Sequence, residues 1–281
     1  MPIVVENLTH VYAAGTPFET RALDNINLTV NDGEFVGLIG HTGSGKSTLI
    51  QHLNAIMKPT SGRVLVDGED INEGANKVKV RRKVGLVFQY PEYQLFEETV
   101  EKDVSFGPGN LKLEQDEIDR RVRDALITVG LDESHWKKSP FELSGGQKRR
   151  AAIAGVLAMQ PKVLILDEPA AGLDPAGRSE MRKMIRRIRD TGATVIMVSH
   201  SMDDVARMCE RIIVMNKGRI ALDGSPEKVF SNSDLLDDMH LGLPAAARLR
   251  DRLNARGFSI SSEVYTIERL RDAILELVKK G

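Results

Sequence analysis

One stretch of the sequence decides the fold, Gly40-His41-Thr42-Gly43-Ser44-Gly45-Lys46-Ser47. It follows Phe35 to Ile39, an apolar run with the length of a buried strand, and it opens the helical pattern Ser47 to Leu53. The glycines allow backbone N–H groups to close around phosphate oxygens, and the helix N-terminus adds partial positive charge. The stretch therefore predicts a phosphate-binding loop in which Lys46 reaches the β- and γ-phosphates and Ser47 ligates Mg²⁺.

Further strand patterns lie on both sides of this loop in the sequence. They are Ile3 to Tyr12, Ala22 to Val30, Arg63 to Val66, Val84 to Phe88, Lys162 to Leu166, Ala193 to Ser199 and Arg211 to Asn216. Charged helical patterns dominate from about residue 95 to 160, and the helical pattern Arg178 to Thr191 separates two of the later strands. Alternation of strand and helix predicts an α/β fold with a largely parallel, buried sheet.

The composition excludes several classes of protein. The chain has 281 residues, of which 41% are apolar and 28% charged, and its 39 Lys and Arg balance 40 Asp and Glu. Nucleic-acid-binding domains usually carry a basic surplus, so we expect no nucleic-acid partner. The single cysteine, Cys209, excludes an internal disulfide and fits a reducing compartment. No apolar run reaches the roughly 18 to 20 residues of a membrane span, and the N-terminus lacks a signal-peptide pattern.

A second chemical motif is Val163-Leu164-Ile165-Leu166-Asp167-Glu168-Pro169, a buried strand that ends in two carboxylates. Carboxylates in this setting need a cation or strong hydrogen bonds. Asp167 is placed to hold the Mg²⁺ shell, whereas Glu168 faces the other way and would polarise a water as general base. The alternative is a strand that simply ends in solvent at Pro169.

A third motif, Leu143-Ser144-Gly145-Gly146-Gln147, precedes the helical run Lys148 to Met159. It is either a second backbone anion site or a plain helix cap. The basic triplet Lys148-Arg149-Arg150 is interpreted as a solvated helix face rather than a nucleic-acid patch.

Together these motifs resemble the nucleotide-binding subunits of ATP-binding cassette (ABC) transporters, over about residues 3 to 230. In the order of the chain, the matches are Walker A at Gly40 to Ser47, the Q-loop at Gln89, the signature at Leu143 to Gln147, Walker B at Val163 to Asp167, the catalytic glutamate at Glu168, the D-loop at Ala171 to Asp174, and the switch histidine at His200. The resemblance implies a P-loop core with a mostly parallel sheet, an antiparallel β subdomain and a helical subdomain.

The resemblance also implies roles for individual residues. ATP would contact Tyr12, Gly40, His41, Thr42, Gly43, Ser44, Gly45, Lys46, Ser47 and Thr48, with Tyr12 stacked on adenine unless it is a core aromatic. Mg²⁺ would be bound by Ser47, Gln89 and Asp167, and catalysis would use Glu168, His200 and Gln89. Two cassettes would face head to tail, so that Ser144, Gly145, Gly146 and Gln147 act on the partner's ATP. Asp174 would be the D-loop residue. The other five histidines are expected to be structural or surface residues.

The segment Phe88 to Pro108 narrows the resemblance to energy-coupling factor (ECF) importers. Tyr90-Pro91-Glu92 is most similar to the second of their two ATPase types. This resemblance implies a groove at Pro91, Glu92, Leu95 and Phe96 for the coupling helices of a membrane scaffold, although a local apolar core is the alternative. It also implies a second, homologous ATPase, a small substrate-binding membrane protein, uptake of vitamins or transition-metal ions, and a peripheral position on the cytoplasmic face of the cell membrane.

We expect an ATPase domain at residues 1–231, with its helical subdomain at about 95–160, and a small α/β extension at 232–281. The helical patterns of the extension, Ala245 to Arg256 and Thr266 to Lys280, flank Phe258 to Val264, and dimer contact is its expected role. One alternative is the homodimeric ATPase of a cobalt or nickel importer. A soluble ABC protein of ribosomes or DNA is disfavoured by the single cassette, and a non-hydrolysing regulatory module by the presence of both Glu168 and His200.

Overall fold

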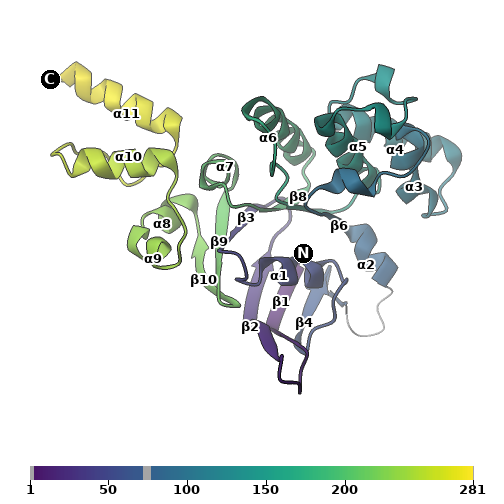
Figure 1. Ribbon diagram of the computed structural model, residues 1–281, viewed down its shortest axis with the longest axis horizontal. Coiled ribbons are helices and arrows are strands. Elements are labelled where there is room, and N and C mark those ends of the chain that lie inside the picture. Colours follow the sequence, from purple (N-terminus) through teal and green to yellow (C-terminus); the bar gives the residue numbers. More distant parts are fainter. Residues whose placement is uncertain (1–2, 72–76, 281) are drawn as a thin grey trace.

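The structure is a computed structural model that describes residues 3–71 and 77–280 (Figure 1). Its centre is a six-stranded sheet in the order β10-β9-β3-β8-β7-β6. The strands are β3 Phe35–Ile39, β6 Val84–Val87, β7 Val163–Asp167, β8 Thr194–Val198, β9 Arg211–Asn216 and β10 Arg219–Gly224. All pairs are parallel except β9 with β10, a hairpin whose second strand the sequence analysis did not predict.

The central strands are apolar along their whole length because both faces of the sheet are covered. In β3, Phe35 and Ile39 pack into one hydrophobic core, whereas Val36 and Leu38 pack into a second core on the opposite face. Alternate side chains of a strand point to opposite faces, so a strand buried on both sides has no polar alternation. The helices α6 Pro175–Asp190 and α7 Met202–Met208 lie over the first face (Figure 1).

A four-stranded antiparallel sheet, in the order β2-β1-β4-β5, packs over the second face together with helix α1. Its strands are β1 Ile3–Tyr12, β2 Thr20–Val30, β4 Ser61–Val66 and β5 Glu69–Asp70, and α1 spans Lys46–Leu53. The pairing of β1 is irregular near its end, with register shifts on both sides of His10 against β2 and a break between Glu6 and Thr9 against β4.

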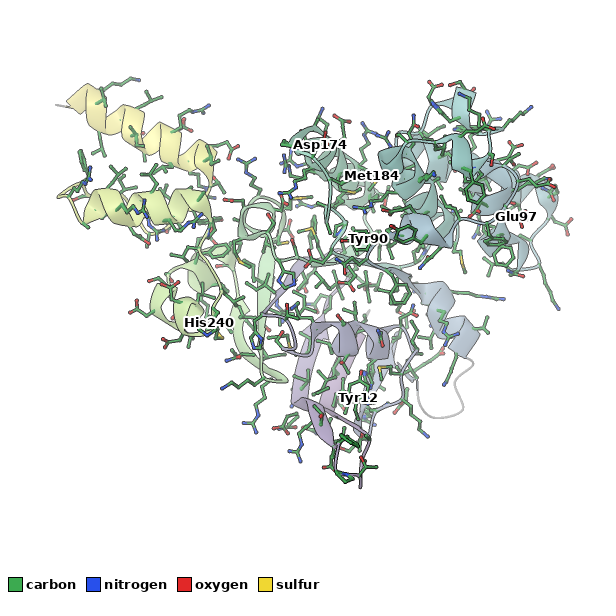
Figure 2. All side chains as sticks on the ribbon, in the orientation of Figure 1. Tyr12, Tyr90, Glu97, Asp174, Met184 and His240 are labelled. Atoms are coloured by element: carbon green, nitrogen blue, oxygen red, sulfur yellow. The ribbon has the colours of Figure 1, made fainter. Side chains whose placement is uncertain are left out.

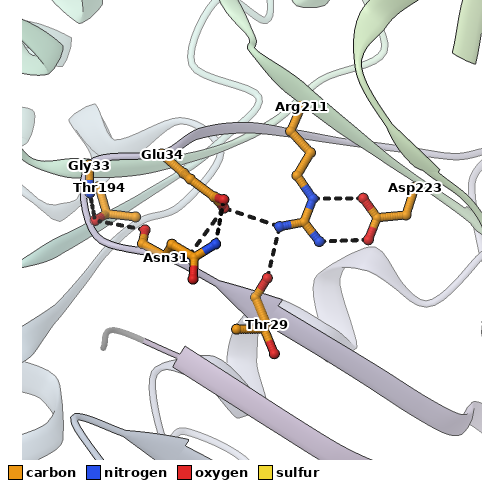
Figure 3. A network of polar contacts seen from close by, with 7 residues as sticks. All are labelled: Thr29, Asn31, Gly33, Glu34, Thr194, Arg211 and Asp223. Carbon is orange, nitrogen blue, oxygen red and sulfur yellow. Dashed lines mark hydrogen bonds and ion pairs between the residues drawn. The ribbon is translucent and has the colours of Figure 1, made fainter. Parts of the chain in front are cut away.

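Arg211 joins the two sheets (Figure 3). It lies on β9 and makes a two-bond ion pair with Asp223 of β10, at 2.7 and 2.6 Å. The same guanidinium donates to the Thr29 carbonyl of β2 at 2.8 Å and to Glu34 at 3.1 Å. Because one planar group bonds elements of both sheets, the sheets are fixed relative to each other at this point.

A helical region packs beside the other end of the parallel sheet. It contains α3 Val100–Gly109, α4 Gln115–Thr128 and α5 Gly145–Leu157, and α2 Lys77–Lys83 precedes β6. The expected change from strands to helices after about residue 95 agrees with these elements. No helix among the described residues is long and apolar enough to cross a membrane.

The C-terminal part contains α8 Pro226–Phe230, α9 Ser233–Asp238, α10 Ala245–Asn254 and α11 Ile267–Lys280. The last two helices share a small core of their own around Ala246, Ile260 and Leu270. The expectation of an α/β extension was wrong for the described residues 232–280, which contain helices and loops only. Residues 258–264 form no strand because side chains of α10 satisfy their backbone: Asn254 bonds both the N–H and the carbonyl of Ile260, at 2.8 and 2.9 Å.

Candidate functional site

A cleft of about 530 Å³ lies at the carboxyl ends of the parallel strands. Ligand sites of α/β sheets occur at this edge because loops from several strands converge there. The cleft is lined by Tyr12, Thr20, Arg21, Ala22, Thr42, Gly43, Gly45, Lys46, Ser47, Thr48, Gln89, Asp167, Glu168, Val198 and His200. The structure therefore brings together residues from every motif of the sequence analysis except the signature and the D-loop. Thr20, Arg21 and Ala22 were not predicted.

The phosphate-binding loop connects β3 to α1 as expected. Gly40 and Gly45 have φ of +154° and +104°, and a Cβ atom would lie 2.4 Å from the Met215 carbonyl at Gly40 and 2.6 Å from the Ala22 carbonyl at Gly45. Only glycine fits these two positions. Gly40, His41 and Ser44 shape the loop without lining the cleft; Ser44 is fully buried.

Lys46 is buried and folded back over the loop that precedes it. Its Nζ donates to the carbonyls of Gly40 and His41 at 2.7 and 3.0 Å. Burial lowers the pKa of Lys46, and the charges of Glu168 and Asp167 partly oppose that shift. A nucleotide phosphate would offer this ammonium stronger acceptors than carbonyl oxygens.

Asp167 and Glu168 are partly buried carboxyl groups with raised pKa values. Burial raises the pKa of Asp167, and burial together with the neighbouring Asp167 raises the pKa of Glu168 to about 7. Glu168 Oε1 is buried and accepts no hydrogen bond from the described residues, although His200 Nε2 lies 3.5 Å away. Glu168 also has a φ of +51°, an uncommon backbone conformation that aims its side chain into the cleft. This group is arranged for a ligand or water that it must bind.

The residues around Asp167 suit a magnesium ion. Ser47, Gln89 and Asp167 all line the cleft and supply a hydroxyl, an amide oxygen and a carboxylate. Mg²⁺ prefers oxygen ligands and usually retains waters and substrate phosphates in its shell. The described part of the chain contains no cluster of three or more His, Cys, Asp or Glu that would hold a metal ion without such a substrate.

Tyr12 stands at the edge of the cleft, at the end of β1 (Figure 2). Its side chain is 41% exposed, and its hydroxyl lies 3.2 Å from Thr48 Oγ1 on α1. The ring is thus open to a ligand on one side and held on the other, so it is not the core aromatic that was its alternative interpretation.

The signature residues lie outside this cleft, at the start of α5. Ser144 caps the helix: its side chain accepts from Gln147 N, and Gln147 Oε1 accepts from Ser144 N. Gly145 and Gly146 have open space where a Cβ would lie. Asp174 caps α6 by accepting from Gly177 N at 2.7 Å. These residues do not reach the cleft of their own chain.

The interpretation of Lys148-Arg149-Arg150 as a solvated face was wrong for Arg149. Its side chain is only 3% exposed and makes a two-bond ion pair with Glu92 at 2.7 and 3.0 Å. The same guanidinium donates to the carbonyls of Pro169 and Ala171 at 3.2 and 2.7 Å. We name this cluster the Arg149 junction. It joins the signature helix to the segments that follow Gln89 and Glu168. Arg149 lies one helical turn from the buried Ile153, and this spacing could have indicated that Arg149 is on the buried face of the helix.

A second hollow, of about 330 Å³, lies between the sheet and the helical region. Leu95 and Phe96 line it, and Phe96 packs edge-on against Phe106 at 5.1 Å while remaining 59% exposed. Of the residues expected in a groove, Pro91 is buried and Glu92 is held in the Arg149 junction, so neither lines the hollow. Tyr90 lies between the central sheet and the helical region (Figure 2), with its ring 5.6 Å from the Arg149 guanidinium.

Comparison with known proteins gives consistent results. Residues 23–171 match a family model described as "ABC transporter". The chain is 55% identical over 284 residues to a protein of Clostridium perfringens named "Energy-coupling factor transporter ATP-binding protein EcfA2", covering all of both chains. A protein of the same name from Clostridium tetani is 55% identical over 280 residues, which is 99% of this chain and 97% of the relative.

Solved structures agree with these matches. The chain resembles cbiO1 of Clostridium perfringens, described as part of the ABC transporter complex cbiONQ, with a TM-score of 0.75 and 44% identity over 89% of this chain and 98% of that one. It also resembles the dimeric ATP-binding cassette MJ0796 bound to ADP and Pi, with a TM-score of 0.70 and 31% identity over 80% of this chain and 98% of that one.

Proposed function

The chain belongs to the ABC transporter family, and within it to the ATP-binding proteins of energy-coupling factor transporters, and from that premise we propose how its cleft and its surfaces work. It is the ATP-binding subunit of such a transporter and couples ATP hydrolysis to transport. The observation that carries the proposal is that residues of the phosphate loop, Gln89, both carboxyl groups and His200 all line the same cleft.

In the proposed reaction, Glu168 is the general base. Glu168 lines the cleft, its Oε1 accepts no hydrogen bond from the described residues, and its raised pKa of about 7 suits a group that takes a proton from water near neutral pH. His200, 3.5 Å from Glu168, would orient that water and the γ-phosphate. Lys46 and the loop amides bind the phosphates, and Tyr12 stacks on adenine.

Ser47, Gln89 and Asp167 would hold Mg²⁺, whose charge, once bound, neutralises phosphate oxygens. The partly buried carboxyl of Asp167, with its raised pKa, supports this role because a cation there would offset the cost of removing its charge from water.

We infer that the cleft is completed by a second ATPase subunit. Two observations support this: the cleft is not lined by Ser144, Gly145, Gly146 or Gln147, and the helix N-terminus that they form suits an anion. We propose a heterodimer with a homologous ATPase; a homodimer, as in cobalt and nickel importers, is the second candidate.

We propose that the hollow at Leu95 and Phe96 receives the coupling helices of a transmembrane scaffold, with the chain bound to the cytoplasmic face of the membrane. An exposed aromatic pair over an apolar hollow is the support for this contact. A small membrane subunit would bind the transported vitamin or metal ion.

The test is purification of the tagged chain from solubilised native membranes, followed by mass spectrometry. Recovery of a second ATPase with a multi-span scaffold and small membrane proteins is the expected result. Recovery of self-copies with a scaffold would favour the homodimer, and the absence of any membrane partner would overturn the transport proposal. Replacement of Phe96 by Asp should abolish recovery of the scaffold, whereas replacement of the exposed Phe18 by Asp should not.

A further inference from the structure

Two histidines lie side by side behind the cleft, and the reaction described above uses neither. His52 is fully buried on α1, the helix that begins in the phosphate loop, and His10 is 9% exposed on β1. Their rings lie 4.7 Å apart at 68°, and His52 Nε2 is 3.2 Å from His10 Nδ1. They lie among aliphatic side chains, where a polar pair costs free energy unless its hydrogen bonds are made.

The contacts assign the tautomers of both rings. His52 Nδ1 lies 2.7 Å from the Thr48 carbonyl, which can only accept, so this nitrogen carries the proton. In a neutral His52 the Nε2 is then an acceptor, and His10 donates to it from Nδ1. Burial lowers the pKa of His52, which favours this neutral form.

His10, His52, Thr48 and Tyr12 form a continuous ring of contacts. His10 and Tyr12 lie two residues apart on one face of β1, and their rings pack edge-on at 4.5 Å. The Tyr12 hydroxyl reaches Thr48 Oγ1 at 3.2 Å, and the Thr48 carbonyl accepts from His52, which leads back to His10. Tyr12 is therefore held at its ring and at its hydroxyl: the ring contact leads to α1 through His10, and the hydroxyl contacts both Thr48 of α1 and Met57, at 3.4 Å from its Sδ.

Tyr12 pairs with Thr20 of β2, but the part of β1 that leads to it is irregular. The pairing of β1 with β4 ends at Thr9, and the pairing with β2 shifts register on both sides of His10. Such irregularities interrupt the ladder of backbone hydrogen bonds. Side-chain contacts with α1 therefore add to the pairing with β2 in fixing the end of the strand against the helix.

We propose that His10 and His52 are a positioning pair that holds Tyr12 at a fixed place relative to the phosphate loop and thereby sets the affinity for the base of the nucleotide. This inference rests on the proposed function in one respect, the stacking of Tyr12 on adenine. Neither histidine lines the cleft, so the pair acts through Tyr12. A preorganised platform reduces the entropy lost when the nucleotide binds.

The test measures nucleotide binding to the full-length chain. His10→Phe keeps a ring beside Tyr12 but removes the donor, and His52→Leu removes the acceptor. Each should weaken ATP binding by about 5- to 20-fold, the size of one or two lost hydrogen bonds. His52→Gln, which can still present an acceptor to His10, should restore most of the affinity. Inorganic tripolyphosphate, which has no base, should bind all variants like the wild type.

Turnover supplies the second measurement. In the assembled transporter at saturating ATP, the kcat of each variant should stay within about twofold of wild type while KM rises, since only binding is affected. Equal weakening of tripolyphosphate, or a kcat that falls as far as affinity does, would overturn the inference, because both would mean that the pair merely supports the phosphate loop.

Tyr12→Ala separates this inference from the proposed function. If Tyr12→Ala weakens ATP binding and the histidine variants do not, the inference fails and the proposed function stands. If Tyr12→Ala binds ATP normally, the adenine role of Tyr12 fails. If the inference holds, adding His10→Phe to Tyr12→Ala causes no further loss, because the two changes act on one interaction.

Discussion

The ATP cleft and the Arg149 junction both bury charge near the same edge of the sheet, and they treat that charge in opposite ways. In the cleft, Glu168 keeps an oxygen without a hydrogen-bond partner among the described residues, and its pKa rises to about 7. In the junction, Arg149 donates four hydrogen bonds, and although burial alone would raise the pKa of Glu92, the Arg149 guanidinium lowers it. The cleft therefore leaves a carboxylate oxygen available for a ligand, whereas in the junction the charges of Arg149 and Glu92 are paired with each other.

The largest expected effect lies in the cleft. Glu168→Gln should reduce kcat for ATP hydrolysis by about 10²- to 10⁴-fold, the size of a lost general base, while ATP binding is retained. The free energy of unfolding should not fall, because the replacement removes a charge that is costly to bury. Turnover and urea unfolding check both points, with the exposed Glu180→Gln as control. Near-wild-type turnover would show that Glu168 is not the base.

The junction should respond in the reverse manner. Arg149→Met should lower the free energy of unfolding by about 3–5 kcal/mol, because it leaves the Glu92 carboxylate buried without its partner. Arg186→Met, on the exposed face of α6, should change it by less than about 0.5 kcal/mol. A loss in Arg149→Met no larger than in this control would mean that the junction contributes nothing to stability. The double variant with Glu92→Leu should recover part of the loss.

Ligand binding should stabilise the cleft. At about 100 times its Kd, ATP with Mg²⁺ should raise the free energy of unfolding by about 2.7 kcal/mol, the amount that mass action requires for a ligand of the folded state. Unfolding in urea with and without nucleotide measures it. Lys46→Ala should lose most of this gain at the same ATP concentration, and an equal gain in that variant would place the nucleotide elsewhere.

The smallest effect concerns Glu92 alone. Glu92→Gln keeps an acceptor for Arg149 but removes the charge, so we expect a loss of about 1–2 kcal/mol at neutral pH. Because the folded protein holds the pKa of Glu92 below its ordinary value of 4.5, this contribution is present above about pH 4.5 and is lost as pH falls further. The stability difference between wild type and variant should therefore shrink in acid. A constant difference from pH 7 to pH 3 would exclude the ionic contribution.

The elements that form the cleft could be predicted from the sequence because each of them is encoded by a short run of adjacent residues. The glycines of the phosphate loop, the strand that ends in Asp167 and Glu168, and the strand before His200 each define a short element, and parallel strands bring their carboxyl ends together without further instruction. The packing of the two sheets then places Tyr12 of β1 and His200, which follows β8 and lies 188 residues further along the chain, around one cleft.

The Arg149 junction was missed because its partners lie far along the chain. Arg149 and Glu92 are 57 residues apart, and a charge triplet on a helix is most often solvated, so only the buried period of α5 could have indicated the outcome. The C-terminal part was mistaken for a related reason. Ile260 and its neighbours have residue types that are common in strands. The Asn254 side chain, however, makes the two backbone hydrogen bonds of Ile260 that a neighbouring strand would otherwise make, and no residue pattern around Ile260 predicts this.

The bonds of Arg211 to Thr29, Glu34 and Asp223 have a consequence for measuring motion. Because they join the two sheets, a pair of spectroscopic labels, one on β2 and one on β10, has a constant separation and can serve as an internal ruler. None of these Arg211 bonds reaches the helical region, so a third label on α4 would report any displacement driven by nucleotide against that fixed length. The Arg211 bonds thus supply a reference length against which a displacement of the helical region can be measured.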